Sequence, residues 1–256
     1  MKFWKEFGQA IKEGPGEDWT NKEQIAKLLR FTTTQTDSED AAVSLDDYIA
    51  RMKPDQEKIF FVTGENFAAT KSSPHLEIFR KKGIEVLLLH DRVDEWLMSH
   101  LTEYQDKPFQ SITRGGLDLG ELGDKTSEEH LKQAETDFSA TLEKAREILK
   151  DVVKDIRLTE RLTDSPACIV VDEQDLSSQM ERLLRASGQA VPTHKPILEL
   201  NPDHRMIQRL KEEMDQERFA DWAHILFDQA VLAEGGQLSD PASFVRRFNK
   251  LLLELS

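Results

Sequence analysis

The sequence predicts an α/β fold class, in which a small layered α/β/α segment is followed by a mainly helical α+β domain. Two short runs, Ile59–Val62 and Val86–Leu89, are apolar on both faces, which is typical of strands covered by helices on both sides. Between them, Ser73 suits a helix cap, Pro74 suits the first helical position, and Gly83 suits the helix end. Strand, helix and strand then form a βαβ unit with parallel strands and a right-handed crossover.

Two further helices and a junction complete the first half of the chain. Capping-box spacing at Thr20–Glu23 and Ser44–Asp47 predicts that helices start at both places. Residues Asp118–Asp137 carry seven acids against two lysines, with four glycines in or just before them. That composition is typical of a solvated junction. We therefore predict two domains, residues 1–118 and 119–256.

The second half is predicted to be rich in helices. A helical stripe from Leu131 to Leu149 predicts a long opening helix. A short strand at Ile169–Val171 and a helix from about Asp175 to Ala186 are expected next. Asn201–Pro202 and Asp240–Pro241 each combine a capping side chain with a proline suited to the first helical position. Helices are therefore expected to begin at both pairs.

The last two predicted helices are apolar on more sides than one core can cover. Arranged as a hairpin, they would form a four-helix bundle with the same helices of a second copy. The alternative is that both helices close the core of a monomeric domain. The predicted dimer-interface residues are Ile225, Phe227, Val231, Phe244, Phe248, Leu251, Leu252 and Leu255.

Two apolar features are candidates for a binding surface. Leu176, Met180, Leu183 and Leu184 fall at positions i, i+4, i+7 and i+8 of a helix whose other positions are mostly polar. Taken alone, such a stripe is more often ordinary core than binding surface. Trp96 follows two acids in the first turn of a predicted helix. Its indole either packs under the sheet or lies exposed as a contact for hydrophobic segments.

Composition excludes several classes of partner. A net charge of −14 over 256 residues argues against nucleic acid, because phosphate contacts need clustered Lys and Arg. The single cysteine, Cys168, excludes an internal disulfide framework and is consistent with a reducing compartment. No apolar run approaches membrane-spanning length, and charged residues interrupt any signal peptide at the start. We therefore expect a cytoplasmic protein without a membrane partner.

The sequence predicts no catalytic residue, cofactor site or metal site. The glycine motifs that bind phosphate in nucleotide sites are absent. The seven histidines include no pair at zinc-site spacing. The best local cluster for a metal, His90 with Asp91, Asp94 and Glu95, is most simply a strand end followed by the acidic first turn of a helix. Cys168 is most simply a small buried hydrophobe rather than a nucleophile.

Six motifs occur in order along essentially the whole chain: Phe3–Gly8, Asn21 through Lys27–Phe31, Ser44–Tyr48, Ser73–Glu77, Asp94–Trp96 and Asn201–His204. Together they resemble the heat-shock protein 90 chaperone family, closest to its bacterial HtpG branch. The resemblance implies the latter part of a middle domain followed by a carboxy-terminal dimerisation domain. It also implies that the family's ATP-binding domain has no counterpart here. A helical stripe that begins at Phe3, with no room for a cap, likewise suggests a chain cut from a longer protein.

The resemblance implies a chaperone fragment of the heat-shock response that binds non-native client proteins in the cleft of a homodimer. Co-chaperones are further expected partners. ATP and Mg²⁺ would serve the intact protein, whereas this fragment would need no cofactor and would not be an enzyme. Trp96 and the stripe of Leu176, Met180, Leu183 and Leu184 would face the cleft and contact clients. Leu176 departs from the methionine expected in close bacterial relatives.

Two other functions remain open from the sequence. One is a scaffold or adaptor dimer that docks a folded partner through the α/β half. Generic unfolded polypeptide would not displace such a partner. The other is an enzyme whose site is assembled from residues distant in the sequence. A deep pocket lined by converging histidine and carboxylate groups would favour the enzyme.

Overall fold

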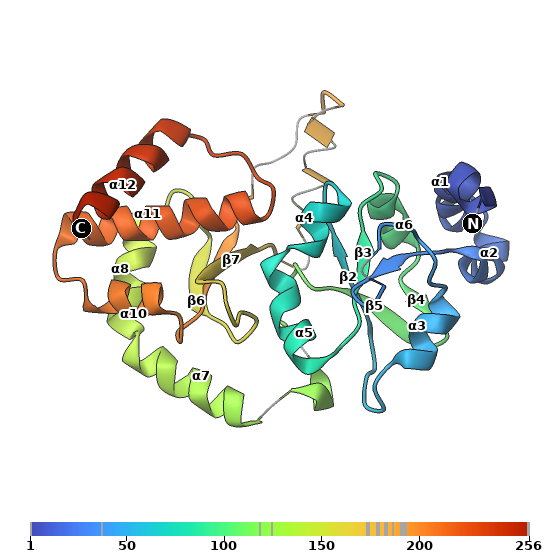
Figure 1. The fold of residues 1–256 in the computed structure, drawn as a ribbon, viewed down its shortest axis with the longest axis horizontal. Coiled ribbons are helices and arrows are strands. Elements are labelled where there is room, and N and C mark those ends of the chain that lie inside the picture. The colour runs from blue at the N-terminus through green and yellow to red at the C-terminus, as the bar shows by residue number, and fades with distance from the viewer. Residues whose placement is uncertain are drawn as a thin grey trace. The chain divides into compact units, whose positions relative to one another are not determined.

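The computed structural model describes residues 2–36, 38–117, 119–123, 125–172, 175–177, 180–181, 184–185, 187–189 and 194–254. Its contacts divide the chain into two compact units. The first comprises Met1–Ile112, Leu117–Gly123 and Gln179–Gly188, and the second comprises Thr113–Gly116, Asp124–Ser178 and Gln189–Ser256. Each unit combines helices with a small mixed sheet, as Figure 1 shows, so the predicted α/β fold class is confirmed.

The first unit is built on a sheet with the strand order β1-β3-β2-β5-β4. β2 pairs in parallel with both β3 and β5, whereas β1 and β4 pair antiparallel at the two edges. Its strands are β1 (Thr32–Thr33), β2 (Ile59–Thr63), β3 (Leu87–Leu89), β4 (Glu103–Tyr104) and β5 (Lys107–Ser111). Its α-helices are α1 (Lys2–Glu17), α2 (Lys22–Leu28), α3 (Leu45–Arg51), α4 (Phe67–Lys71), α5 (Glu77–Lys82) and α6 (Asp94–His100). Short 3₁₀ helices are η1 (Trp19–Asn21), η2 (Pro74–Leu76) and η3 (Gly120–Leu122).

Apolar residues of the central strands alternate between two cores, one on each face of this sheet. In β2, Ile59 packs with α2, α3 and α6, whereas Phe60 and Val62 pack with η2 and α5. In β3, Leu87 packs in the same core as Ile59, and Leu88 packs in the same core as Phe60 and Val62. Because successive side chains of a strand point to opposite faces, this alternation produces three layers. The predicted βαβ unit with helices on both faces is therefore confirmed (Figure 1).

Local caps explain most helix boundaries of the first unit. Gly83 ends α5 in a left-handed conformation with φ of 61°, which glycine adopts without steric cost. Ser44 and Asp47 form the predicted capping box at the start of α3. The predicted box at Thr20–Glu23 is wrong, because Asp18 caps η1 by accepting a hydrogen bond from the backbone of Asn21.

The second unit surrounds a sheet with the strand order β6-β8-β7, in which β6 and β8 are parallel and β7 and β8 antiparallel. Its strands are β6 (Asp155–Leu158), β7 (Ala167–Val170) and β8 (Ile197–Leu200). Its helices are α7 (Lys125–Asp137), α8 (Ser139–Leu149), α10 (Arg205–Glu212), α11 (Gln216–Ala233) and α12 (Pro241–Glu254). One apolar core joins α7, α8, α10 and α11 to the sheet.

Two predicted helices of the second unit need correction. The stripe from Leu131 to Leu149 belongs to two helices, because the helix breaks at Phe138 between α7 and α8. Asn201 does not start a helix. Its side chain accepts a hydrogen bond from the backbone of Asp203 in a local turn, and His204 then caps α10. The helix predicted at Asp240–Pro241 is confirmed as α12.

A buried ion-pair network connects the start of the second unit to its sheet. Glu199 of β8 lies 2.8 Å from Arg161 Nε and 2.6 Å from Arg157 Nη2. Both arginines also donate to the carbonyl of Gly115, whose N–H donates to the carbonyl of Val171. Burial alone would raise the pKa of Glu199, but attraction to the two arginines lowers it. The carboxylate therefore stays charged inside the unit.

Candidate functional site

Trp96 lies half-exposed on the surface of the first unit. Its side chain is 45% exposed, and its ring lies against His100 of the same helix, tilted by 44° with 4.0 Å between ring centroids. The indole packs against Gly16 so closely that a Cβ added there would lie 2.7 Å from Trp96 Nε1. The indole of Trp96 is therefore partly exposed at the surface rather than packed under the sheet.

A buried triad of charges fixes α6, which carries Trp96, against α1. Lys12 Nζ of α1 lies 2.7 Å from one carboxylate oxygen of Asp91 and 2.7 Å from one of Asp94. Burial would lower the pKa of Lys12, but the two carboxylates raise it. Burial raises the pKa of Asp94, whereas attraction to Lys12 outweighs burial and lowers the pKa of Asp91. Breaking such a buried cluster would release α6 from α1.

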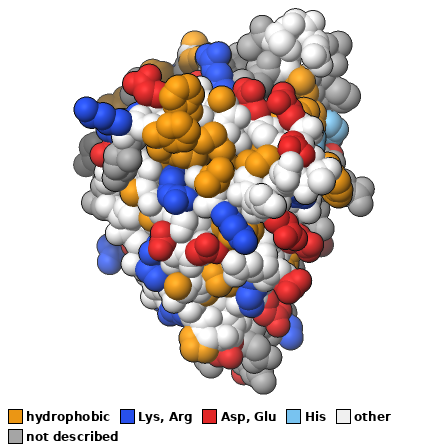
Figure 2. Space-filling view, turned by 90° about the vertical axis from the view of Figure 1, so that its right-hand side faces the viewer, with side chains coloured by type: hydrophobic (Ala, Val, Ile, Leu, Met, Phe, Trp, Pro, Cys, Tyr) orange, Lys and Arg blue, Asp and Glu red, His pale blue; other side chains and the backbone are white. Residues whose placement is uncertain are grey.

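Further apolar side chains lie exposed at the end of the unit formed by α1 and α2 (Figure 1). Phe3 and Phe7 of α1 are more than half exposed, with 5.1 Å between their ring centroids. Trp19 of η1 is 76% exposed, and Leu28 of α2 is also mostly exposed. Figure 2 shows hydrophobic side chains gathered on the face that includes this end. Sequence reasoning missed Trp19, although its place directly after the acidic end of α1 was a usable signal.

The predicted stripe at 176–184 is only partly described. Leu176, Met180 and Leu184 are each partly exposed and belong to none of the buried cores. Met180 and Leu184 are helical, but Leu176 precedes the helical residues, so the predicted start near Asp175 is wrong. Leu183 lies outside the described residues. At its three described positions the stripe is therefore neither fully buried nor fully exposed.

The predicted dimer-interface residues divide into core and surface. Ile225 and Leu251 are 1% and 5% exposed within a single chain, so both are core residues and their assignment to the interface is corrected. Three others pack partly against the same core: Phe227, Val231 and Phe244. Leu255 lies outside the described residues.

The exposed side of α12 carries its own apolar row. Phe248 and Leu252 are 39% and 49% exposed, and Val245 is 53% exposed. These three residues are spaced at i, i+3 and i+7, which places them on one side of a helix. Sequence reasoning missed Val245, which the same helical periodicity could have identified. Leu253, at 78% exposed, extends the apolar surface.

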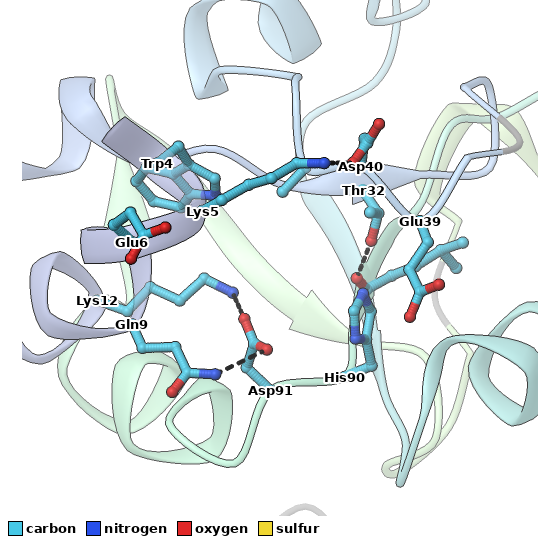
Figure 3. A pocket seen from close by; sticks show the side chains of 13 residues that line it. Trp4, Lys5, Glu6, Gln9, Lys12, Thr32, Glu39, Asp40, His90 and Asp91 are labelled. Atoms are coloured by element: carbon cyan, nitrogen blue, oxygen red, sulfur yellow. Dashed lines mark hydrogen bonds and ion pairs between the residues drawn. The ribbon is translucent and has the colours of Figure 1, made fainter. Parts of the chain in front are cut away.

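A polar pocket of about 350 Å³ lies beside α1 in the first unit (Figure 3). It brings His90 near carboxylates, the arrangement that would favour an enzyme. Two of these carboxylates are occupied by lysines, however, since Lys5 lies 2.8 Å from Asp40 and Lys12 lies 2.7 Å from Asp91. Glu6 and Glu39 also line the pocket, whereas the carboxylates of Asp40 and Asp91 are held in these ion pairs and are less suited to act as a general base.

The described part of the chain also bears on membrane-spanning helices and metal sites. None of the helices described there is both long and apolar enough to cross a bilayer. Within the same residues, no cluster of three or more His, Cys, Asp or Glu side chains is placed to hold a metal ion.

Comparison with known proteins decides the family. A family model described as Hsp90 protein matches residues 1–255. The chain belongs to the Hsp90 family. Similar proteins, each named Chaperone protein HtpG, include those of Nitrosomonas eutropha, Pseudoalteromonas translucida and Nitrosococcus oceani. They are 61%, 58% and 56% identical over 98%, 99% and 100% of this chain.

The match confirms the resemblance to the Hsp90 family and its HtpG branch. The chain spans 39 to 40% of the length of these relatives, so it corresponds to part of an Hsp90 protein.

Proposed function

We propose that this part of the Hsp90 protein binds non-native client polypeptides through exposed apolar side chains of a homodimer. The half-exposed indole of Trp96 is the observation that carries the proposal, because the Lys12 triad and Gly16 hold it in one position at the surface. A large aromatic ring that is already ordered costs little conformational entropy when a client covers it.

The second component of the proposal is the partly exposed stripe of Leu176, Met180 and Leu184. Unbranched methionine adapts to varied partners, which suits a surface that must accept many sequences. Leu183 remains part of the proposed client-binding set.

The third component is dimerisation through α12. The row of Val245, Phe248 and Leu252 offers an apolar side to the same row of a second copy. With the partly buried Phe227 and Val231 of α11, two such hairpins would form a four-helix bundle. A stable dimer of this kind would bury roughly 2,000 Å² or more.

The intact protein would couple client binding to ATP and Mg²⁺, and it would act in the cytoplasm with co-chaperones. These properties are expected from the Hsp90 family. None of the six family motifs found in this chain belongs to the family's ATP-binding domain. The present chain would bind clients by mass action and hold aggregation-prone surfaces apart.

Aggregation suppression by matched surface variants tests the proposal. Trp96→Ser should weaken protection of a thermally aggregating protein, while Met214→Ser, which alters an 89% exposed apolar side chain in the second unit, should not. Both variants should keep the melting temperature within a few degrees, because neither side chain is core. Equal protection by both variants would contradict the role of Trp96.

The stripe is tested by Met180→Ser combined with Leu184→Ser. Since both residues are partly exposed, the melting temperature should change little, whereas protection of the aggregating protein should fall. A large loss of stability would show that the stripe is core, and unchanged protection would remove it from client binding.

A further inference from the structure

Trp19 and Trp96 lie on the same end of α1. Trp96 packs against Gly16, and Trp19 follows Gly16 by three residues in η1. Because consecutive Cα atoms are about 3.8 Å apart, the Cα atoms of Gly16 and Trp19 are at most about 11 Å apart. An extended polypeptide rises about 3.3 Å per residue, so a segment of four or five residues would be long enough to contact both indoles.

The indole of Trp19 offers a face that accepts cations. Its side chain is 76% exposed, the highest exposure of any tryptophan that the structure describes. Lys22 Nζ already lies 4.8 Å from the ring centroid, in a cation–π contact. Asp18 caps η1, the short helix that carries Trp19, by accepting hydrogen bonds from the backbone and side chain of Asn21.

Acidic residues surround this end of α1. Glu13, Glu17 and Glu23 are exposed, and Asp18 lies partly exposed among them. Hydrogen bonds from Asn21 lower the pKa of Asp18, which is therefore charged at neutral pH. Within residues 13–23, these four acids face one lysine. The charge of this segment is therefore negative and complements a cationic ligand.

We propose that Gly16, Trp19 and Trp96 form one binding strip, the tryptophan strip, for apolar or aromatic client segments flanked by Lys or Arg. This inference rests on the proposed client-binding function and adds both a residue, Trp19, and a class of client sequence. The indoles contact the apolar side chains, and the surrounding carboxylates attract the basic flanks.

Peptide binding followed by fluorescence anisotropy tests the strip. Three labelled peptides share one apolar, aromatic centre of five residues and differ only in flanks of two lysines, two serines or two glutamates. The wild-type chain should bind the lysine-flanked peptide at least tenfold more tightly than the glutamate-flanked one, and added salt should reduce this preference. Equal affinity for all three peptides would overturn the charge preference.

Single and double variants identify the residues involved. Trp19→Ser and Trp96→Ser should each weaken binding of the lysine-flanked peptide about three- to tenfold, and the double variant should show coupling because one segment contacts both rings. Glu13→Gln with Glu17→Gln should weaken only the lysine-flanked peptide. The control Glu147→Gln, an exposed acid on α8, should leave all affinities unchanged.

The outcomes separate this inference from the proposed function. Loss of binding in Trp96→Ser with normal binding in Trp19→Ser would overturn the strip while leaving client binding by Trp96 intact. Normal binding in both variants would overturn the strip and the role of Trp96 together. Melting temperatures near that of the wild type would establish that any loss of binding is local, since neither indole belongs to a buried core.

Discussion

Replacing Glu199 by glutamine should destabilise the second unit strongly. Glu199 and Arg161 have side chains that are 3% and 0% exposed, and the carboxylate also pairs with Arg157. Without the negative charge, the guanidinium of Arg161 remains buried and poorly compensated. Breaking a buried pair in this way costs about 3–5 kcal/mol. At about 2–4 °C per kcal/mol for a chain of this size, the melting temperature should fall by about 6–20 °C.

An exposed ion pair supplies the matched control. Lys150 Nζ and Glu147 Oε1 are 2.6 Å apart, as close as Arg157 and Glu199, but their side chains are 60% and 75% exposed. Solvent screens such pairs, so Glu147→Gln should change the melting temperature little. Thermal unfolding followed by circular dichroism compares the two variants directly. If Glu199→Gln lowered the melting temperature no more than Glu147→Gln, burial would not determine the strength of the network.

Three further predictions follow from pKa, packing and backbone conformation. The folded-state pKa of Glu199 lies below the ordinary value of 4.5, so the stability that this group contributes is present above pH 4.5 and is lost as pH falls through the folded-state pKa. Stability measured against pH should therefore fall less steeply in acid for Glu199→Gln than for the wild type. Leu251→Asp should unfold the second unit, because it places a charge in the core. Leu252→Asp should leave the unit folded and reduce the mass measured by light scattering from dimer to monomer. A folded Leu251→Asp variant would contradict the assignment of Leu251 to the core. Gly83→Ala should cost about 1 kcal/mol because alanine is strained at positive φ, and unchanged thermal stability would refute that reason.

The central fold elements could be predicted because their signals are local. Apolar runs in β2 and β3 and the glycine that ends α5 lie within one continuous stretch of sequence. Asp240–Pro241 was predicted correctly for the same reason, since Asp240 caps α12 through the backbone of Ser243. Asn201–Pro202 carries the same local signal, yet there the asparagine stabilises a turn. Short capping motifs therefore predict a change of direction more reliably than the helix that follows.

Which side chains of the candidate site are exposed depends on contacts between residues that are distant in the sequence. The sequence could not place Trp96, because its position is set by Gly16 and by the pairing of Lys12 with Asp94. Periodicity identified α12 as apolar on several sides, but it did not show that Leu251 faces the core. Which side of a helix becomes surface is decided by packing, which periodicity alone does not specify.

The buried network around Glu199 was also beyond sequence reasoning. A single glutamate inside the apolar run of β8 was a signal that a charge would be buried. Its partners, Arg161 and Arg157, lie about forty positions earlier in the chain, as the separations of 38 and 42 residues show. Only the pairing of β6 with β8 brings them together.

The most direct test of client binding compares one polypeptide in two conformations. A disulfide-bonded protein is labelled and then used either native or reduced and alkylated, so that the same sequence is presented folded or unfolded. Fluorescence anisotropy should detect saturable binding of the unfolded form and none of the native form, with weaker binding by Trp96→Ser. Binding of the native form with equal affinity, or no binding of the unfolded form by the wild-type chain, would contradict the proposed chaperone function.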